Sequence, residues 1–181
     1  MRTSNHGFTL IELMITIFVG AILAAVAVPA FSGFLHEDRN IGQVNSLVAS
    51  LNYARSEAIK RALPAGVTVC PSTDDKTCTG TPWSSGWIVV IQDLTTPANN
   101  IVLQSVPALN GSNVLTQTNP AGPTTGVTYQ SSGLISGPLA VEICDTRGSA
   151  YARDVEVNIM GRIAASQQHG LSAAQAPLVC P

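Results

Sequence analysis

The chain begins with a long apolar stretch that carries one charge. Between Phe8 and Leu35 the only charged side chain is Glu12. A helix needs about 20 apolar residues to cross the hydrocarbon core of a bilayer, so this stretch is long enough to span one. A carboxylate near the start of such a helix costs about 2.5–3.5 kcal/mol on insertion scales. An isolated anchor gains nothing from that cost, so Glu12 is predicted to have a partner within the membrane.

A second helical pattern continues directly from the first. Apolar residues recur at spacings of three and four, as one face of a helix requires: Ile41, Val44, Leu47, Val48, Leu51, Ala54, Ala58 and Ala62. The opposite face is predicted to be polar, with Arg39, Gln43, Asn52, Arg55, Glu57, Lys60 and Arg61. Leu63-Pro64-Ala65-Gly66 ends the pattern. The helix is therefore expected to run from Phe8 to about residue 62, with its second half packed against a domain on one side.

Beyond Gly66 the sequence predicts short strands separated by turns. Runs rich in β-branched residues indicate six strands: Val67–Cys70, Trp87–Ile91, Ile101–Val106, Gly126–Tyr129, Leu139–Cys144 and Asp154–Met160. The segments 95–100 and 110–126 are rich in Thr, Asn, Pro and Gly, which favours turns or long loops. We expect an α+β fold in which the long N-terminal helix packs on antiparallel β-sheets. Residues 36–181, which include the second half of the helix, would form one globular domain.

The composition and the cysteines indicate an exported domain. Charged residues make up 11% of the chain, and the net charge is −2. Arg2 precedes the apolar span, which places the N-terminus in the cytoplasm and the domain outside. Four cysteines, Cys70, Cys78, Cys144 and Cys180, allow three pairings in an oxidising compartment. We favour Cys70–Cys78, which closes a short loop, and Cys144–Cys180, which fixes the C-terminal tail.

Other candidate sites have simpler structural explanations. Trp83 and Trp87 could form a carbohydrate platform, but such residues more often cover a core. Asp74-Asp75-Lys76 could contribute to a calcium site, yet it reads more simply as a turn. The histidines are scattered and no CxxC occurs, so no metal or other cofactor is expected. No nucleophile motif or phosphate loop is present, which excludes the common enzyme classes.

The residues Gly7-Phe8-Thr9-Leu10-Ile11-Glu12 resemble the class III signal of type IV prepilins and pseudopilins. The resemblance implies that prepilin peptidase removes residues 1–7 by cutting between Gly7 and Phe8, and methylates the new amine of Phe8. In a filament, Glu12 of one subunit would neutralise the terminal amine of its neighbour, because opposite charges attract strongly at low dielectric. The alternative is an ordinary signal peptide cleaved after Ala27 or Ala30, which small residues there would permit.

Pro29 interrupts the apolar stretch. Proline in a helix interior removes one backbone hydrogen bond and clashes with the preceding turn. It can be a tolerated kink in a membrane helix. In type IV pilins a proline near this position marks a place where the helix bends or melts locally on packing into the filament, and the resemblance implies that role for Pro29.

The globular part resembles the GspH/FimT group of minor pilins and pseudopilins, through Leu51–Arg61, Cys70-Pro71-Ser72, the segment Trp83–Trp87, and Gly161-Arg162. The resemblance implies a subunit that is held in the inner membrane as a single-pass protein, with its domain in the periplasm or outside the cell when assembled. Its partners would be membrane lipid, other major and minor pilins, and the inner-membrane assembly platform. It would help initiate or cap a type IV pilus or a type II secretion pseudopilus, and two disulfides favour the pilus.

A DNA-uptake receptor or an adhesin on the pilus is the alternative. Some members of the group bind DNA and carry a second arginine two positions after the Gly-Arg pair. Here Arg162 is followed at that place by Ala164, and clustered Lys and Arg are lacking, which weakens the DNA interpretation.

Overall fold

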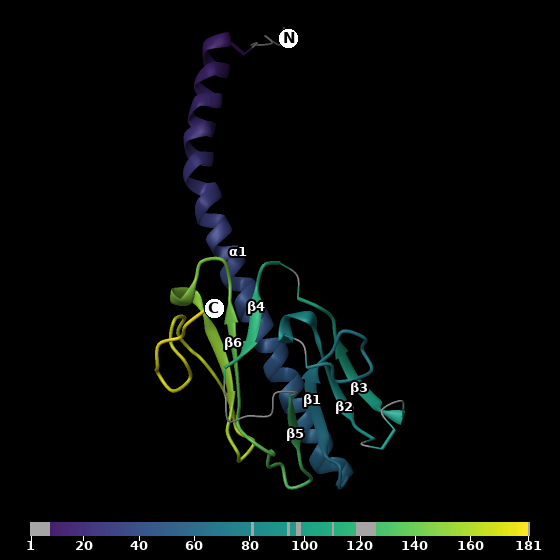
Figure 1. The fold of residues 1–181 in the computed structure, drawn as a ribbon. Coiled ribbons are helices and arrows are strands. Elements are labelled where there is room, and N and C mark those ends of the chain that lie inside the picture. The colour runs from purple at the N-terminus through teal and green to yellow at the C-terminus, as the bar shows by residue number, and fades with distance from the viewer. Residues whose placement is uncertain are drawn as a thin grey trace, which may run out of the picture. The chain divides into compact units, whose positions relative to one another are not determined.

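In a computed structural model the chain consists of one long helix followed by short strands (Figure 1). The structure describes residues 8–80, 82–93, 95–96, 99–109, 111–118 and 126–180, and only the backbone of Pro29 and Ala30. The helix, α1, runs from Leu10 to Arg61. The chain divides into two compact units, Met1–Asp38 and Arg39–Pro181, so the first part of α1 belongs to one unit and its second part to the other.

The bounds of α1 follow from local chemistry at each end. Thr9 caps the start: its hydroxyl accepts the Glu12 N–H at 3.3 Å, and its carbonyl accepts the Leu13 N–H at 3.2 Å. At the other end Ala62 has a positive φ of 50°, and Pro64 cannot continue the helix. The sequence therefore placed both ends within two residues, and the helix is continuous through Pro29 and Gly33.

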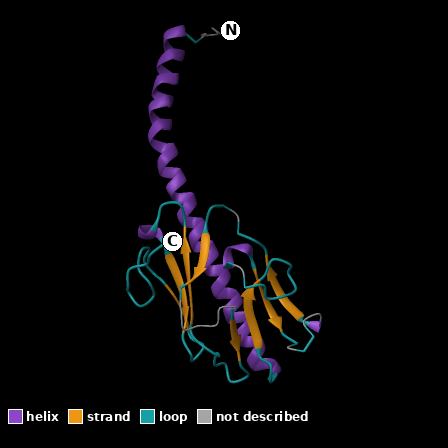
Figure 2. Cartoon of the chain, in the orientation of Figure 1, coloured by secondary structure: helices purple, strands orange, loops and turns teal. Residues whose placement is uncertain are grey.

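Two antiparallel four-stranded sheets follow α1 (Figure 2). The first contains β1 (Val67–Pro71), β2 (Trp87–Ile91), β3 (Ile101–Val106) and β5 (Val127–Tyr129), in the order β3-β2-β1-β5. The second contains β4 (Val114–Gln117), β6 (Leu139–Cys144), β7 (Arg153–Val157) and β8 (Ile163–Ala165), in the order β4-β6-β7-β8. Short 3₁₀ turns occur at Trp83–Ser85 and Ser149–Tyr151. This is the expected α+β, pilin-like architecture.

One hydrophobic core joins the second part of α1 to both sheets. The helix contributes Leu47, Leu51, Ala54 and Ala58, all fully buried. The sheets contribute alternating residues such as Val67 and Val69 of β1, Val141 and Ile143 of β6, and Val155 and Val157 of β7. Alternation arises because successive side chains of a strand point to opposite faces.

The apolar face of α1 differs from the prediction at four positions. Ile41 and Ala62 are exposed, although the spacing placed them on the buried face, and Ala62 lies just after the end of α1. Gln43 and Glu57 were assigned to the polar face and are buried. Both have polar partners: Asn113 donates to Gln43 Oε1 at 2.7 Å, and Arg61 donates to Glu57 Oε2 at 2.6 Å.

Five of the six predicted strands match to within a residue at each end, and the sixth differs at its end. It was expected to continue to Met160 but ends at Val157. Asn158 ends it: its side-chain oxygen accepts the N–H groups of Met160 and Arg162, both at 3.1 Å, which closes a turn. Strands β4 and β8 were not predicted. β4 lies in a segment rich in Thr, Asn and Gly, and β8 has only three residues, so neither presents a strong pattern.

Candidate assembly site

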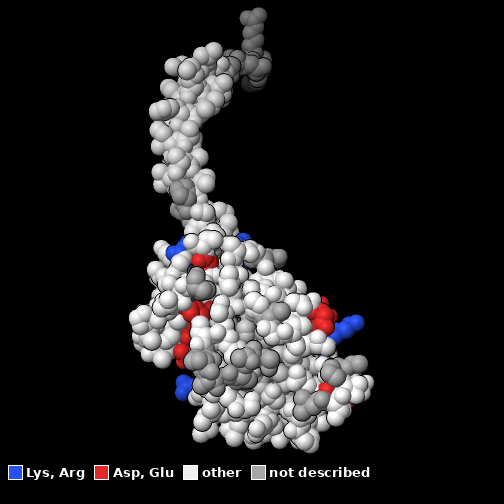
Figure 3. Space-filling model, in the orientation of Figure 1, with Lys and Arg blue, Asp and Glu red and all other residues white. Residues whose placement is uncertain are grey.

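The first part of α1 exposes apolar side chains all round. Phe8 is 75% exposed and Leu10 is 77% exposed, and bulky residues down to Leu35 are similarly uncovered. The most apolar window of the helix has a mean hydropathy of 2.5 and none of it is buried within the chain. On the face drawn in Figure 3, charged atoms gather over the globular unit, while this part of the helix shows none. By length and composition the helix can cross a membrane, and its surface requires lipid or another apolar partner.

Glu12 lies in the first turn of this apolar helix. A negative charge is favoured there because the first N–H groups of a helix carry partial positive charge. The spacing Thr9-x-x-Glu12 is that of a capping box, in which a Thr at the N-cap is followed three residues later by Glu. Thr9 was not singled out from the sequence, although this spacing could have identified it. Glu12 therefore lies at the start of the helix, within one turn of the expected new terminus at Phe8.

Other predicted assembly residues are only partly described. Gly7 lies outside the described residues, as does the rest of segment 1–7, and only the backbone of Pro29 is described.

Two glycines lie within the first part of α1, Gly20 and Gly33. A Cβ atom added at either would meet nothing within 4 Å. The fold of the chain itself therefore does not require glycine at these two positions.

A buried polar network joins the second part of α1 to the second sheet. Asn40, fully buried, donates to Asp145 Oδ2 at 2.9 Å and accepts from Asn113 at 2.6 Å. Arg147 binds the same Asp145 carboxylate at 2.6 Å and lies 4.2 Å over the ring of Tyr151. Burial alone would raise the pKa of Asp145, but the hydrogen bonds from Arg147 and Asn40 hold it below its ordinary value. No local pattern of residues indicates this network, because its partners lie as many as 105 positions apart.

Both disulfides have the favoured pairing. Cys70–Cys78 closes a loop after β1, and Cys144–Cys180 joins the end of β6 to the C-terminal segment. The loop between the first pair is ordered by Asp74, whose carboxylate accepts the N–H groups of Lys76 and Thr77 and the hydroxyls of Ser72 and Thr77. These hydrogen bonds lower the pKa of Asp74. Asp74-Asp75-Lys76 therefore forms a turn stabilised by the side chain of Asp74.

The tryptophans are core residues. Trp83 is 2% exposed and Trp87 is fully buried, with ring centroids 6.4 Å apart. The indole N–H of Trp87 donates to the hydroxyl of Ser50 on α1 at 3.0 Å. This confirms the structural interpretation of the pair, since neither ring is available as a carbohydrate platform.

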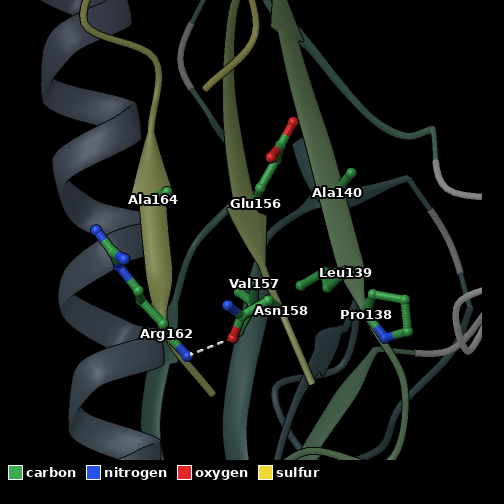
Figure 4. Close-up of a pocket in the computed structure, with 8 residues that line it drawn as sticks. All are labelled: Pro138, Leu139, Ala140, Glu156, Val157, Asn158, Arg162 and Ala164. Carbon is green, nitrogen blue, oxygen red and sulfur yellow. Dashed lines mark hydrogen bonds between the residues drawn. The ribbon is translucent and has the colours of Figure 1, made fainter. Parts of the chain in front are cut away.

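Arg162 is exposed beside a shallow groove of about 380 Å³ on the second sheet (Figure 4). The groove is lined by Glu156 and by the small residues Ala140 and Ala164, among others. The preceding Gly161 has a positive φ of 70° and lies against the carbonyl of Gly133, where a Cβ atom would clash. The Gly161-Arg162 pair is thus explained in part by close backbone contact, and the arginine shares its groove with an acidic side chain.

Two family models match the chain. The model described as type II transport protein GspH covers residues 43–161, and the one described as the prokaryotic N-terminal methylation motif covers residues 2–28. The chain belongs to the GspH family. The family match lies over the second part of α1 and strands β1 to β7, and the methylation motif includes Gly7, Phe8 and Glu12.

Solved structures support the fold of this GspH-family chain. The type IV minor pilin FimU of Pseudomonas aeruginosa, in a P21 crystal form, matches with a TM-score of 0.61 and 18% identity, covering 82% of this chain and 99% of FimU. The P65 form matches with a TM-score of 0.56 and 18% identity, covering 76% of this chain and 97% of FimU. At this identity the likeness shows a shared fold. Members of this pilin and pseudopilin family are structural subunits, not enzymes.

Proposed function

We propose that this chain is a minor pilin or pseudopilin that helps to initiate or cap a type IV pilus or a type II secretion pseudopilus. Prepilin peptidase would cut between Gly7 and Phe8 and methylate Phe8. The mature chain would be stored in the inner membrane through α1, with its globular unit in the periplasm, until the assembly platform adds it to a filament. Its partners would be other major and minor pilins.

The observation that carries this proposal is one carboxylate in the first turn of a helix that is otherwise apolar all round. The exposed apolar surface needs lipid before assembly and neighbouring helices afterwards. Glu12 needs a positive partner in both environments. Cleavage before Phe8 would create that positive charge in every subunit, one helical turn from its own Glu12, at the start of α1. Pairing between subunits would then set their axial register.

The first test is the N-terminus of the mature protein. Mass spectrometry of the chain isolated from its native membrane is expected to give a start at Phe8, with one methyl group on the amine. A chain that begins at Phe31, or that keeps residues 1–7, would remove the basis of the proposal.

The second test separates assembly from membrane insertion. Glu12→Ala is expected to insert and be processed normally, yet to lose most of its co-isolation with other pilins in sheared or detergent-solubilised filaments. Met14→Ala is the matched control, because Met14 is an exposed apolar residue in the same part of the helix. If Glu12→Ala co-isolates with other pilins as well as the unmodified chain does, Glu12 does not set the register between subunits.

Binding of DNA receives no support from the geometry. Arg162 shares its groove with Glu156, and the basic residues of the described surface do not form a continuous stripe on the face drawn in Figure 3. The proposal is therefore restricted to filament assembly. Which of the two machines contains the subunit can be tested by identifying the proteins that cross-link to it in native membranes.

A further inference from the structure

The C-terminal segment 166–180 lies against the face of the second sheet that points away from the core, and we call it the strap. At its start, the N–H of Ser166 donates to the Asp154 carbonyl at 3.0 Å. In its middle, Gly170 donates to Ala152 at 2.7 Å, and the strap folds back on itself through Leu178 and Gly170 at 3.1 Å. At its end Cys180 is bonded to Cys144 of β6. The strap is therefore a loop anchored at both ends.

Two carboxyl groups are buried under the strap. Glu142 of β6 and Asp154 of β7 are directly opposite each other in the antiparallel register, and they are 4% and 3% exposed. Their neighbours along the strands, such as Val141 and Val155, point into the core, so both acids point toward the strap. Like charges directly opposite on neighbouring strands repel each other. Burying both as anions would be costly.

The strap binds these acids through its backbone. The N–H of Ala173 donates to Asp154 Oδ1 at 3.0 Å. The N–H of Val179 donates to the carboxyl of Glu142, whose Oε1 atom has no partner in the part of the chain that the structure describes. Burial raises the pKa of Glu142. The strap therefore covers these two acids and binds their carboxyl groups through its backbone N–H groups.

A third acid, Glu156, adds to the negative charge around Asp154. Glu156 lies two residues along β7, on the same face of the strand as Asp154, and its carboxyl is a close neighbour of that of Asp154. Burial, followed by this contact with Glu156, raises the pKa of Asp154 to about 7.

Other polar and charged groups lie around these acids. Arg162, between β7 and β8, lines the same groove as Glu156. Ser166, which follows β8, contributes a hydroxyl, and β6 contributes only the further acid Glu142. Arg153 directs its guanidinium to the Ser166 carbonyl at 3.3 Å. The one titratable side chain in the strap sequence is His169, whose ring contacts the Ala150 carbonyl and stacks on Tyr151.

We propose that the strap is a proton-dependent cover of the second sheet. It is docked while Asp154, buried opposite Glu142 and beside Glu156, holds its proton, and it opens as a tethered loop between Ser166 and Cys180 when Asp154 loses that proton. The sign follows from linkage: an acid that holds its proton more tightly in the docked form stabilises that form at low pH. The stabilisation is then lost as pH rises through the docked-state value. Opening would uncover the outer face of β6 and β7 to a neighbouring subunit.

Hydrogen exchange of the full chain in detergent, with both disulfides intact, tests this proposal. Peptides that contain Ala173 and Val179 are compared at pH 6 and pH 8.5, after correction for the intrinsic change in exchange rate. With a docked pKa of about 7 and an ordinary value of 3.8, the opening constant of the strap should rise about tenfold between these pH values. Peptides from the buried part of α1, around Leu47 and Leu51, should not change.

Two variants distinguish the proton from a merely structural contact. Asp154→Asn keeps a side-chain oxygen that can accept the Ala173 N–H but cannot ionise, so strap protection should become equal at the two pH values. Glu156→Gln should reduce the pH dependence in the same direction. Asp38→Asn, an exposed acid in the other unit, is the control and should behave as the unmodified chain does.

Three outcomes would overturn the proposal. One is equal strap protection at pH 6 and pH 8.5 in the unmodified chain. Another is a tenfold pH response that persists in Asp154→Asn. The third is full protection restored at pH 8.5 by millimolar Ca²⁺, which would show that the carboxyl groups take up a cation instead. None of these outcomes bears on whether Glu12 is needed for assembly.

Discussion

Removal of the Cys144–Cys180 disulfide is expected to destabilise the globular unit more than removal of Cys70–Cys78. A disulfide stabilises a fold largely by restricting the unfolded chain, and the effect grows with the length of the loop that it closes. The two bonds close loops with sequence separations of 36 and 8. The perturbations are the double variants Cys144→Ser with Cys180→Ser, and Cys70→Ser with Cys78→Ser.

The loop lengths set the size of the two effects. The loop-closure relation gives about 4 kcal/mol for the long loop and about 2.5 kcal/mol for the short one at 25 °C. The difference of about 1.5 kcal/mol corresponds to roughly a tenfold ratio in the unfolding constants. The short loop has additional local order, because Asp74 holds its turn through side-chain hydrogen bonds that remain after the cysteines are replaced.

Urea unfolding of the full chain in detergent provides the measurement. Tryptophan fluorescence reports on the globular unit, because Trp83 and Trp87 are both buried in its core. The unmodified chain and the two double variants are compared at one pH, with their m-values checked for equality. Equal losses of stability, or a larger loss from the Cys70–Cys78 variant, would refute the loop-length argument for this protein.

Three further predictions follow from particular contacts. Asp145→Asn should cost about 1.5–3 kcal/mol at pH 7, because hydrogen bonds to a buried charge are lost. The fold lowers the pKa of Asp145, so the stability that this carboxylate contributes is present above the ordinary value of 3.8 and is lost as the pH falls below it. In urea unfolding, the stability of Asp145→Asn should therefore depend less on pH in this acid range than that of the unmodified chain. Gly161→Ala should destabilise the unit more than Gly148→Ala in the same assay, because both have a positive φ but only Gly161 lies against backbone, that of Gly133. In a low-salt gel shift with the full chain in detergent, no retarded DNA band is expected, and a clear band that Arg162→Ala abolishes would contradict that expectation.

The sequence predicted those features that depend on neighbouring residues. The C-terminal end of α1 was marked by Leu63-Pro64-Ala65-Gly66, because proline cannot continue a helix. The strands with strong β-branched runs, such as Trp87–Ile91, were found at their observed bounds. The family signal at the N-terminus was equally local, because it depends on consecutive residues from Gly7 to Glu12.

Features that depend on distant contacts could not be predicted in this way. Gln43 reads as a surface residue until Asn113, brought to it by the loop before β4, supplies a buried partner. The carboxyl groups of Glu142 and Asp154 become one cluster only through the register of β6 and β7. β4 has a weak pattern of its own and becomes a strand because β6 offers it an edge to pair with.

The open space around Gly20 and Gly33 makes these positions useful as reporters of neighbouring molecules. An added methyl group at either one meets nothing in the chain's own fold. Alanine is also a better helix former than glycine by about 1 kcal/mol, so the isolated helix would only gain from the exchange. Any loss of filaments in Gly20→Ala or Gly33→Ala would therefore measure how closely another backbone approaches, free of damage to the subunit itself.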